Sequence, residues 1–145
     1  ALLLRETDPA LKLRGLLINY GVMDCAMNTP SYSAFATGHF LTREKMDFYW
    51  RCYAPKEADR VSPFASPMRA DLHGLPALLL QVGEDEILRN DSLRLAEKAR
   101  ASGADVRLQR YPNLWHVFQA HAGTLNVADF AIDEVVSFLH QRRFT

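Results

Sequence analysis

Acidic residues and a histidine directly follow two strand-like runs of the chain. The apolar run at residues 75–83 is followed by Asp85 and Glu86, and the alternating run at residues 106–111 leads into a turn and then His116. If both runs are parallel strands, their carboxyl ends open at the same edge of a sheet, where sites form in α/β proteins. The sequence therefore predicts a carboxylate and an imidazole close together at that edge.

A carboxylate beside an imidazole can activate a serine hydroxyl. The neutral imidazole accepts the hydroxyl proton, and a carboxylate bound to its other nitrogen fixes the tautomer and stabilises the imidazolium. In one class of serine triads, the acid and then the base follow the nucleophile along the chain. Because the same order occurs here, the acidic loop and His116 are candidates for the second and third members of a triad.

Strands that alternate with helices must position these side chains. The pattern of apolar residues predicts strands at residues 13–20, 75–83 and 106–111 and helices at 42–53, 90–102 and 127–138. This alternation predicts a parallel α/β sheet of about three strands with flanking helices. Residues 22–70 form an insert between the first two strands, and residues 25–40 within it have loop composition. The first strand would leave an open sheet edge that a segment upstream should cover.

Composition argues against several classes of protein. The chain has 17 basic and 17 acidic residues, so it has no positive excess for binding nucleic acid. Its longest apolar runs are the size of a strand, so we expect no membrane span. Cys25 and Cys52 are isolated and lack metal-ligand spacing, which predicts free thiols in a reducing compartment and hence a cytoplasmic location. We expect no metal and no cofactor.

An ordered set of motifs resembles the hormone-sensitive-lipase family of α/β-hydrolases, which includes bacterial acetyl esterases. The similar segments cover nearly all of the chain and are residues 24–32, 41–42, 62–67, 75–88 and 111–118. The resemblance implies that residues 1–145 are the C-terminal portion of a single α/β-hydrolase domain. It also implies a serine carboxylesterase whose substrates are small, short-chain acyl esters.

The resemblance implies a role for individual residues. Asp85 corresponds to the triad acid and His116 to the triad base, although Glu86, directly after Asp85, is an alternative acid. Many family members have glycine after the histidine, whereas this chain has Val117, which we expect to line the acyl pocket or to pack beneath His116. Trp50, on the aromatic helix of the insert, is a candidate for the pocket wall.

Two motifs of the family do not occur in the sequence. None of the seven glycines forms the nucleophile elbow Gly-x-Ser-x-Gly, and the oxyanion loop His-Gly-Gly is also absent. We expect both upstream of residue 1, with the helix that ends at Leu4 following the elbow. The missing N-terminal half of the fold is therefore an expected partner, and this chain alone should lack esterase activity. A homodimer through residues 106–111 or the last helix is a further expectation.

Other interpretations remain open. A related lactone hydrolase or peptidase would differ in the upstream half of the protein. A non-catalytic α/β binding or interaction module would fold alone and would be insensitive to a change of His116 to alanine. The other histidines show no metal-binding spacing and are interpreted as structural or solvated; they are His39, His73, His121 and His140.

Overall fold

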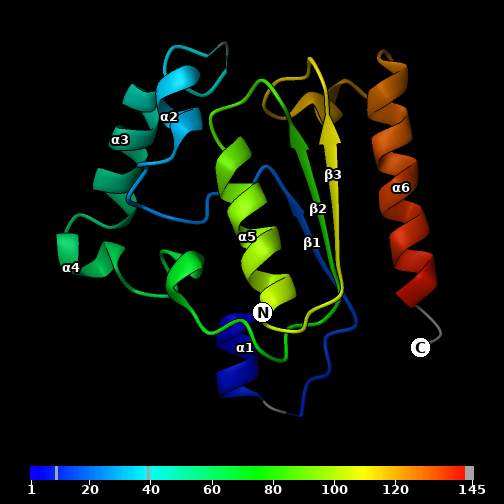
Figure 1. The fold of residues 1–145 in the computed structure, drawn as a ribbon, viewed down its shortest axis with the longest axis horizontal. Helices are drawn as coiled ribbons and strands as arrows, with labels where there is room; N and C mark the ends of the chain where they lie inside the picture. Colours follow the sequence, from blue (N-terminus) through cyan, green and yellow to red (C-terminus); the bar gives the residue numbers. More distant parts are fainter. Residues whose placement is uncertain (9, 39, 143–145) are drawn as a thin grey trace.

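Three parallel strands form the centre of the molecule. The computed structural model of this chain describes residues 1–8, 10–38 and 40–142. The strands are β1 (Leu16–Asn19), β2 (Leu78–Gly83) and β3 (Val106–Tyr111), in the order β1-β2-β3, so their carboxyl ends point the same way (Figure 1). The predicted parallel three-stranded sheet is confirmed.

The central strand β2 is buried along its whole length. All six residues are buried because β2 is paired with a neighbour on each side and covered by a helix on each face. This explains its nearly continuous apolar sequence, which is typical of a central parallel strand. In the described part of the chain, β1 pairs only with β2, and Leu17 remains 37% exposed at that edge.

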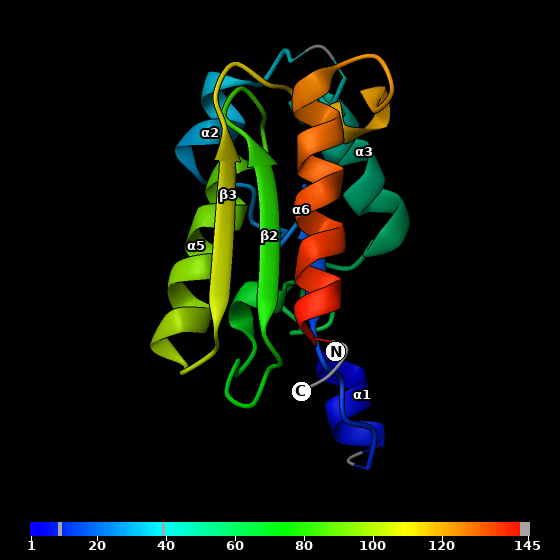
Figure 2. The same cartoon turned by 90° about the vertical axis from the view of Figure 1, so that its right-hand side faces the viewer.

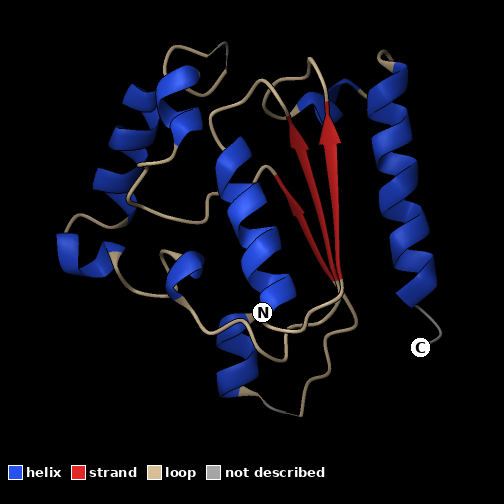
Figure 3. Ribbon diagram, viewed as in Figure 1, coloured by secondary structure: helices blue, strands red, loops and turns tan. Residues whose placement is uncertain are grey.

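Two long helices cover opposite faces of the sheet (Figures 2 and 3). On one face, α5 (Arg89–Ala101) packs Leu95 and its small alanines against Leu78 and Leu80 of β2. On the other face lies α6 (Asn126–Arg142). Both helices confirm the sequence prediction within a few residues. The short helix α1 (Leu2–Thr7) lies beyond the amino-terminal ends of the strands (Figure 1).

A buried polar network joins the sheet to α6. Gln81 of β2 is fully buried, and its amide nitrogen donates to Ala131 O at 2.7 Å and to Gln109 Oε1 at 2.9 Å. Gln109 of β3 in turn donates to Glu134 of α6, and Gln119 donates to Gln81 Oε1 at 3.2 Å. Buried polar groups are costly unless they are paired, so this network fixes the position of α6 on the sheet.

The insert between β1 and β2 contains more helix than expected. Its elements are α2 (Pro30–Ala34), α3 (Arg43–Tyr53), α4 (Glu57–Arg60) and the 3₁₀ turn η1 (Pro67–Arg69). The prediction of α3 is confirmed, and Thr42 caps it by accepting a hydrogen bond from Lys45 N. The prediction that residues 25–40 are loop is wrong for α2, because so short a helix depends on tertiary packing rather than on propensity.

A buried carboxylate holds the insert against α5. Asp91, in the first turn of α5, accepts hydrogen bonds through one oxygen from Met23 N, Asp24 N and the Tyr32 hydroxyl, at 3.0, 3.3 and 3.2 Å. These donors belong to the segment after β1 and to α2. One side chain therefore connects three parts of the chain. Burial raises the pKa of Asp91 above its usual range.

Cys25 is buried and Cys52 is exposed, and both are free thiols. Among the helices of the described residues, none is long and apolar enough to cross a membrane.

The raised pKa of Asp91 predicts a pH effect on stability. The folded chain holds the Asp91 proton to higher pH than the unfolded chain, so this group favours folding below about pH 4. That advantage is lost as pH rises through the folded-state pKa. We expect urea unfolding from about pH 4 to pH 7 to show wild type losing stability relative to Asp91→Asn, which lacks the titration. If the stability of wild type relative to Asp91→Asn stays constant or increases as pH rises, this assignment is contradicted.

Candidate active site

Glu86 and His116 form a hydrogen-bonded pair at the carboxyl edge of the sheet. Glu86 follows β2 and His116 follows β3, and the distance from Glu86 Oε2 to His116 Nδ1 is 2.6 Å. The Glu86 side chain is 1% exposed and the His116 side chain 13% exposed. A carboxylate at Nδ1 selects the tautomer that carries its proton there, which leaves Nε2 as the acceptor. The pair therefore has the arrangement that a general base needs.

The structure pairs Glu86, and not Asp85, with His116, which corrects the expected pairing. Asp85 is exposed on the turn after β2, and no hydrogen bond or ion pair of its side chain is found among the described residues. Its backbone N–H instead donates to Leu114 O at 3.0 Å. The turn points Asp85 outward and returns Glu86 inward, so the next residue along the chain reaches the imidazole.

A close backbone approach at Gly83 brings together two loops, the one after β2 that carries Glu86 (residues 84–88, the acid loop) and the one after β3 that carries His116 (residues 112–117, the base loop). A Cβ atom on Gly83 would overlap the Leu114 carbonyl, so only glycine fits at this position. The Gly83 N–H donates to the second Glu86 oxygen, Oε1, at 3.1 Å. Glu84 N also donates to Tyr111 O at 2.9 Å and extends the β2–β3 ladder into the loops. Both oxygens of the buried Glu86 carboxylate are thereby satisfied.

The base loop contains backbone that is unusual for its residue types. Val117, directly after His116, is half-buried and has φ of 63°. A β-branched residue is strained in this left-handed region, where glycine would be relaxed. The 3₁₀ turn η2 (Phe118–His121) follows at once and buries Phe118. Val117 thus directs the chain from the imidazole into the core, and its role in lining an acyl pocket stays a prediction.

Two aromatic rings that the sequence analysis did not identify lie against His116. The ring centroid of Tyr20 is 5.1 Å from that of His116 with an interplanar angle of 71°, and the corresponding values for Phe40 are 6.1 Å and 31°. Tyr20 is the first residue after β1, which places it at the same sheet edge as His116. That position in the sequence could have predicted the contact. Phe40 lies in the insert, and its position in the sequence does not predict a contact with His116.

Trp50, the other candidate residue, belongs to a buried cluster of the insert. Trp50 is 8% exposed and packs in this cluster with Met46, Ile87 and Leu88, so it supports the residues at the end of the acid loop. Its place in a pocket wall stays a prediction. Three other histidines are exposed, namely His73, His121 and His140, whereas His39 lies outside the described residues.

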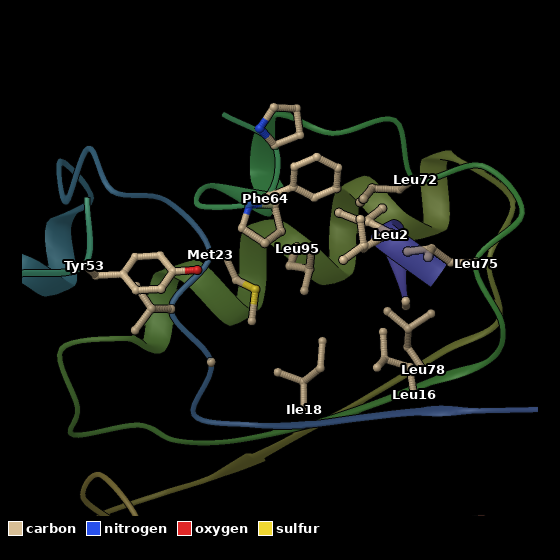
Figure 4. A pocket seen from close by; sticks show the side chains of 16 residues that line it. Leu2, Leu16, Ile18, Met23, Tyr53, Phe64, Leu72, Leu75, Leu78 and Leu95 are labelled. Carbon is tan, nitrogen blue, oxygen red and sulfur yellow. The ribbon is translucent and has the colours of Figure 1, made fainter. Parts of the chain in front are cut away.

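A separate apolar hollow lies beside β1. It has a volume of about 660 Å³ between α1, β1 and α5, and neither Glu86 nor His116 lines it. Figure 4 shows Ile18 and Leu16 of β1 facing Leu2 of α1 and Leu95 of α5 across this space. The hollow therefore exposes apolar side chains that the sheet and its helices leave uncovered.

Comparison with known proteins shows the family of this chain. Residues 1–120 match a family model described as the alpha/beta hydrolase fold. The chain belongs to this family. A hormone-sensitive lipase from a metagenome library superposes with a TM-score of 0.88 at 33% identity, over 97% of this chain and 48% of that protein. An esterase from the bacterial hormone-sensitive lipase family superposes with a TM-score of 0.89 at 30% identity, over 97% of this chain and 47% of its own.

Several curated relatives of this α/β-hydrolase chain are also esterases. An esterase from Acinetobacter venetianus is 31% identical over 135 residues, which is 92% of this chain and 44% of that protein. An ethyl acetate hydrolase from Pseudomonas putida is 27% identical over 84% of this chain and 39% of its own length. The chain thus spans less than half the length of these relatives. The resemblance to the hormone-sensitive-lipase type is confirmed.

The Glu86–His116 hydrogen bond predicts that substitutions at Glu86 and at Asp85 have different effects on the NMR spectrum of His116. Glu86→Gln should remove the low-field Nδ1–H proton resonance of His116 and mix the two neutral tautomers, because an amide accepts a weaker hydrogen bond than a carboxylate. Asp85→Asn is the matched control and should leave both unchanged. Nitrogen-15 NMR of the imidazole measures the effect, and a loss of the resonance in Asp85→Asn instead would reverse the assignment.

The strained backbone of Val117 predicts a stabilising substitution. Val117→Gly should raise the unfolding free energy by about 1 kcal/mol, because it removes left-handed strain from a β-branched residue. Ala122→Gly is the control, since Ala122 is exposed with φ of −55° and should lose about 0.5–1 kcal/mol. Urea unfolding measures both variants. Val117→Ala loses the same packing but keeps a side chain in the left-handed region, so equal stability of Val117→Gly and Val117→Ala would show that Val117 is not strained.

Proposed function

We propose that this chain supplies the acid and the base of a serine carboxylesterase that hydrolyses short-chain acyl esters. The observation that carries the proposal is the 2.6 Å hydrogen bond between Glu86 and His116, on successive strand-end loops of an α/β-hydrolase chain. The esterases among its relatives support the substrate class. In this proposal Glu86 takes the role of triad acid that the sequence analysis assigned to Asp85.

The proposed mechanism uses His116 as a proton shuttle. Nε2 accepts the proton of a serine hydroxyl as its oxygen attacks the ester carbonyl, and Glu86 at Nδ1 stabilises the imidazolium. His116 then gives the proton to the departing alcohol, leaving an acyl-serine. Water attacks this intermediate while His116 accepts a proton from it, and His116 then gives that proton to the departing serine oxygen, which releases the acid and restores the serine hydroxyl. The serine and the oxyanion donors would come from a segment outside this sequence.

We propose that this segment is the remaining half of the same hydrolase fold. The relatives are more than twice as long as the matched region, β1 has an unpaired edge among the described residues, and the apolar hollow lies beside that edge. A strand beside β1 and a helix in the hollow would bury these surfaces, which is the main driving force for association. The same proposal implies that this chain alone does not cleave esters.

Two further parts of the proposal concern assembly and location. The outer side of β3 has no strand partner among the described residues, and α6 exposes Phe130, Val136 and Leu139, which supports a homodimer across this side. The two free thiols support a reducing, cytoplasmic location.

A fusion of this chain to the upstream half of a related esterase tests the proposed roles. The fusion should hydrolyse p-nitrophenyl acetate, and His116→Ala should lower kcat by roughly 10⁶-fold because the serine loses its base. Glu86→Gln should lower kcat by roughly 10⁴-fold, whereas Asp85→Asn should change it by less than about twofold. A folded fusion whose activity is indifferent to His116→Ala would refute the proposal.

The native polypeptide provides an independent test. Its intact mass, measured before and after a fluorophosphonate serine-hydrolase probe, should be roughly twice that of this chain and should gain one adduct, as the lengths of the relatives imply. A native species with the mass of this chain that gains no adduct, and binds no second half, would instead indicate a non-catalytic α/β module.

A further inference from the structure

We propose that Tyr20 is a positioning residue for the His116 imidazole, an inference that rests on the proposed role of His116 as the base. The two rings meet edge to face, with centroids 5.1 Å apart and planes at 71°. This is a favoured geometry for aromatic pairs. Tyr20 follows β1 and His116 follows β3, so the contact reaches across the carboxyl end of β2, which lies between them.

The backbone of Tyr20 supports a specific role for this contact. Its φ is 45°, in the left-handed region that a bulky side chain rarely adopts. Such strain persists only where the surroundings impose it, and it is concentrated at functional sites. Here the Tyr20 N–H donates to Gln81 O at 3.2 Å, which ties the strained residue to the end of the β1–β2 ladder. The chain turns at Tyr20 while the ring stays at the sheet edge.

Tyr20 adds a restraint that Glu86 alone cannot provide. Glu86 holds the imidazole at one atom, Nδ1, and a single hydrogen bond leaves the ring free to tilt about that point. The Tyr20 ring contacts the imidazole as a second, separate restraint. Together the two contacts fix the direction of Nε2, the atom that must face the serine hydroxyl, and general-base catalysis depends on that direction.

Phe40 provides a matched comparison within the same chain. Its ring also lies near His116, but the centroids are 6.1 Å apart, the planes are tilted by 31°, and the side chain is 62% exposed. A more distant and solvated ring restrains the imidazole less. Tyr20 and Phe40 should therefore differ in their effect on His116.

The experiment measures exchange of the His116 Nδ1–H proton with water and the tautomer ratio of the ring by nitrogen-15 NMR of this chain. Tyr20→Asn removes the ring while keeping a residue that tolerates left-handed backbone. We expect exchange about three- to tenfold faster, the scale of one aromatic pair. Tyr20→Phe, which retains the ring, and Phe40→Leu should both match wild type.

Unchanged exchange in Tyr20→Asn, or an equal acceleration in Phe40→Leu, would overturn the inference. Amide spectra of β2 report whether each variant is folded, and if Tyr20→Asn unfolds, Tyr20→Leu is measured against the same expectation. Glu86→Gln separates this inference from the proposed function. If Glu86→Gln leaves the imidazole unaffected, the acid–base pair itself fails, whereas failure of the Tyr20 variants alone removes only the positioning role.

Discussion

The contact between the Gly83 backbone and the Leu114 carbonyl is the constraint on which the rest of the site depends. Because Gly83 has no side chain, the base loop can lie directly on the end of β2. This contact brings His116 within reach of Glu86, and it lets the Gly83 N–H satisfy the other oxygen of the same carboxylate. The full burial of β2 keeps Gly83 in place, so the geometry of the pair is set by the core of the sheet.

Much of the fold could be predicted from the sequence because its signals are local and strong. The apolar run at residues 75–83 and the amphipathic patterns at 90–102 and 127–138 each specify an element that the structure contains. The carboxylate and imidazole could be predicted to meet because parallel strands align their carboxyl ends. Sequence order alone therefore located the sheet edge and the loops that carry the candidate site.

Other features could not be predicted because they depend on three-dimensional contacts. The choice between Asp85 and Glu86 rests on the direction of one turn, which adjacent acidic residues do not reveal. The helix α2 is stabilised by Tyr32 binding Asp91, a residue 59 positions away. The exposed Phe40 approaches His116 from the insert, and no periodic pattern indicates that approach. In each case, the decisive partner is distant in the sequence or its orientation is set by tertiary structure.

The polar network beneath the base loop has a consequence for how this family can vary. Gln81, Gln109, Gln119 and Glu134 belong to four different segments, yet each side chain is hydrogen-bonded to another member of the set. Gln81 and Gln119 are buried, so a change at either one would remove a hydrogen-bond partner from a buried side chain, which costs more than the hydrogen bond itself contributes. Natural variation at Gln81 and Gln119 should therefore be concerted, so that homologues keep the pair or replace it together with apolar residues.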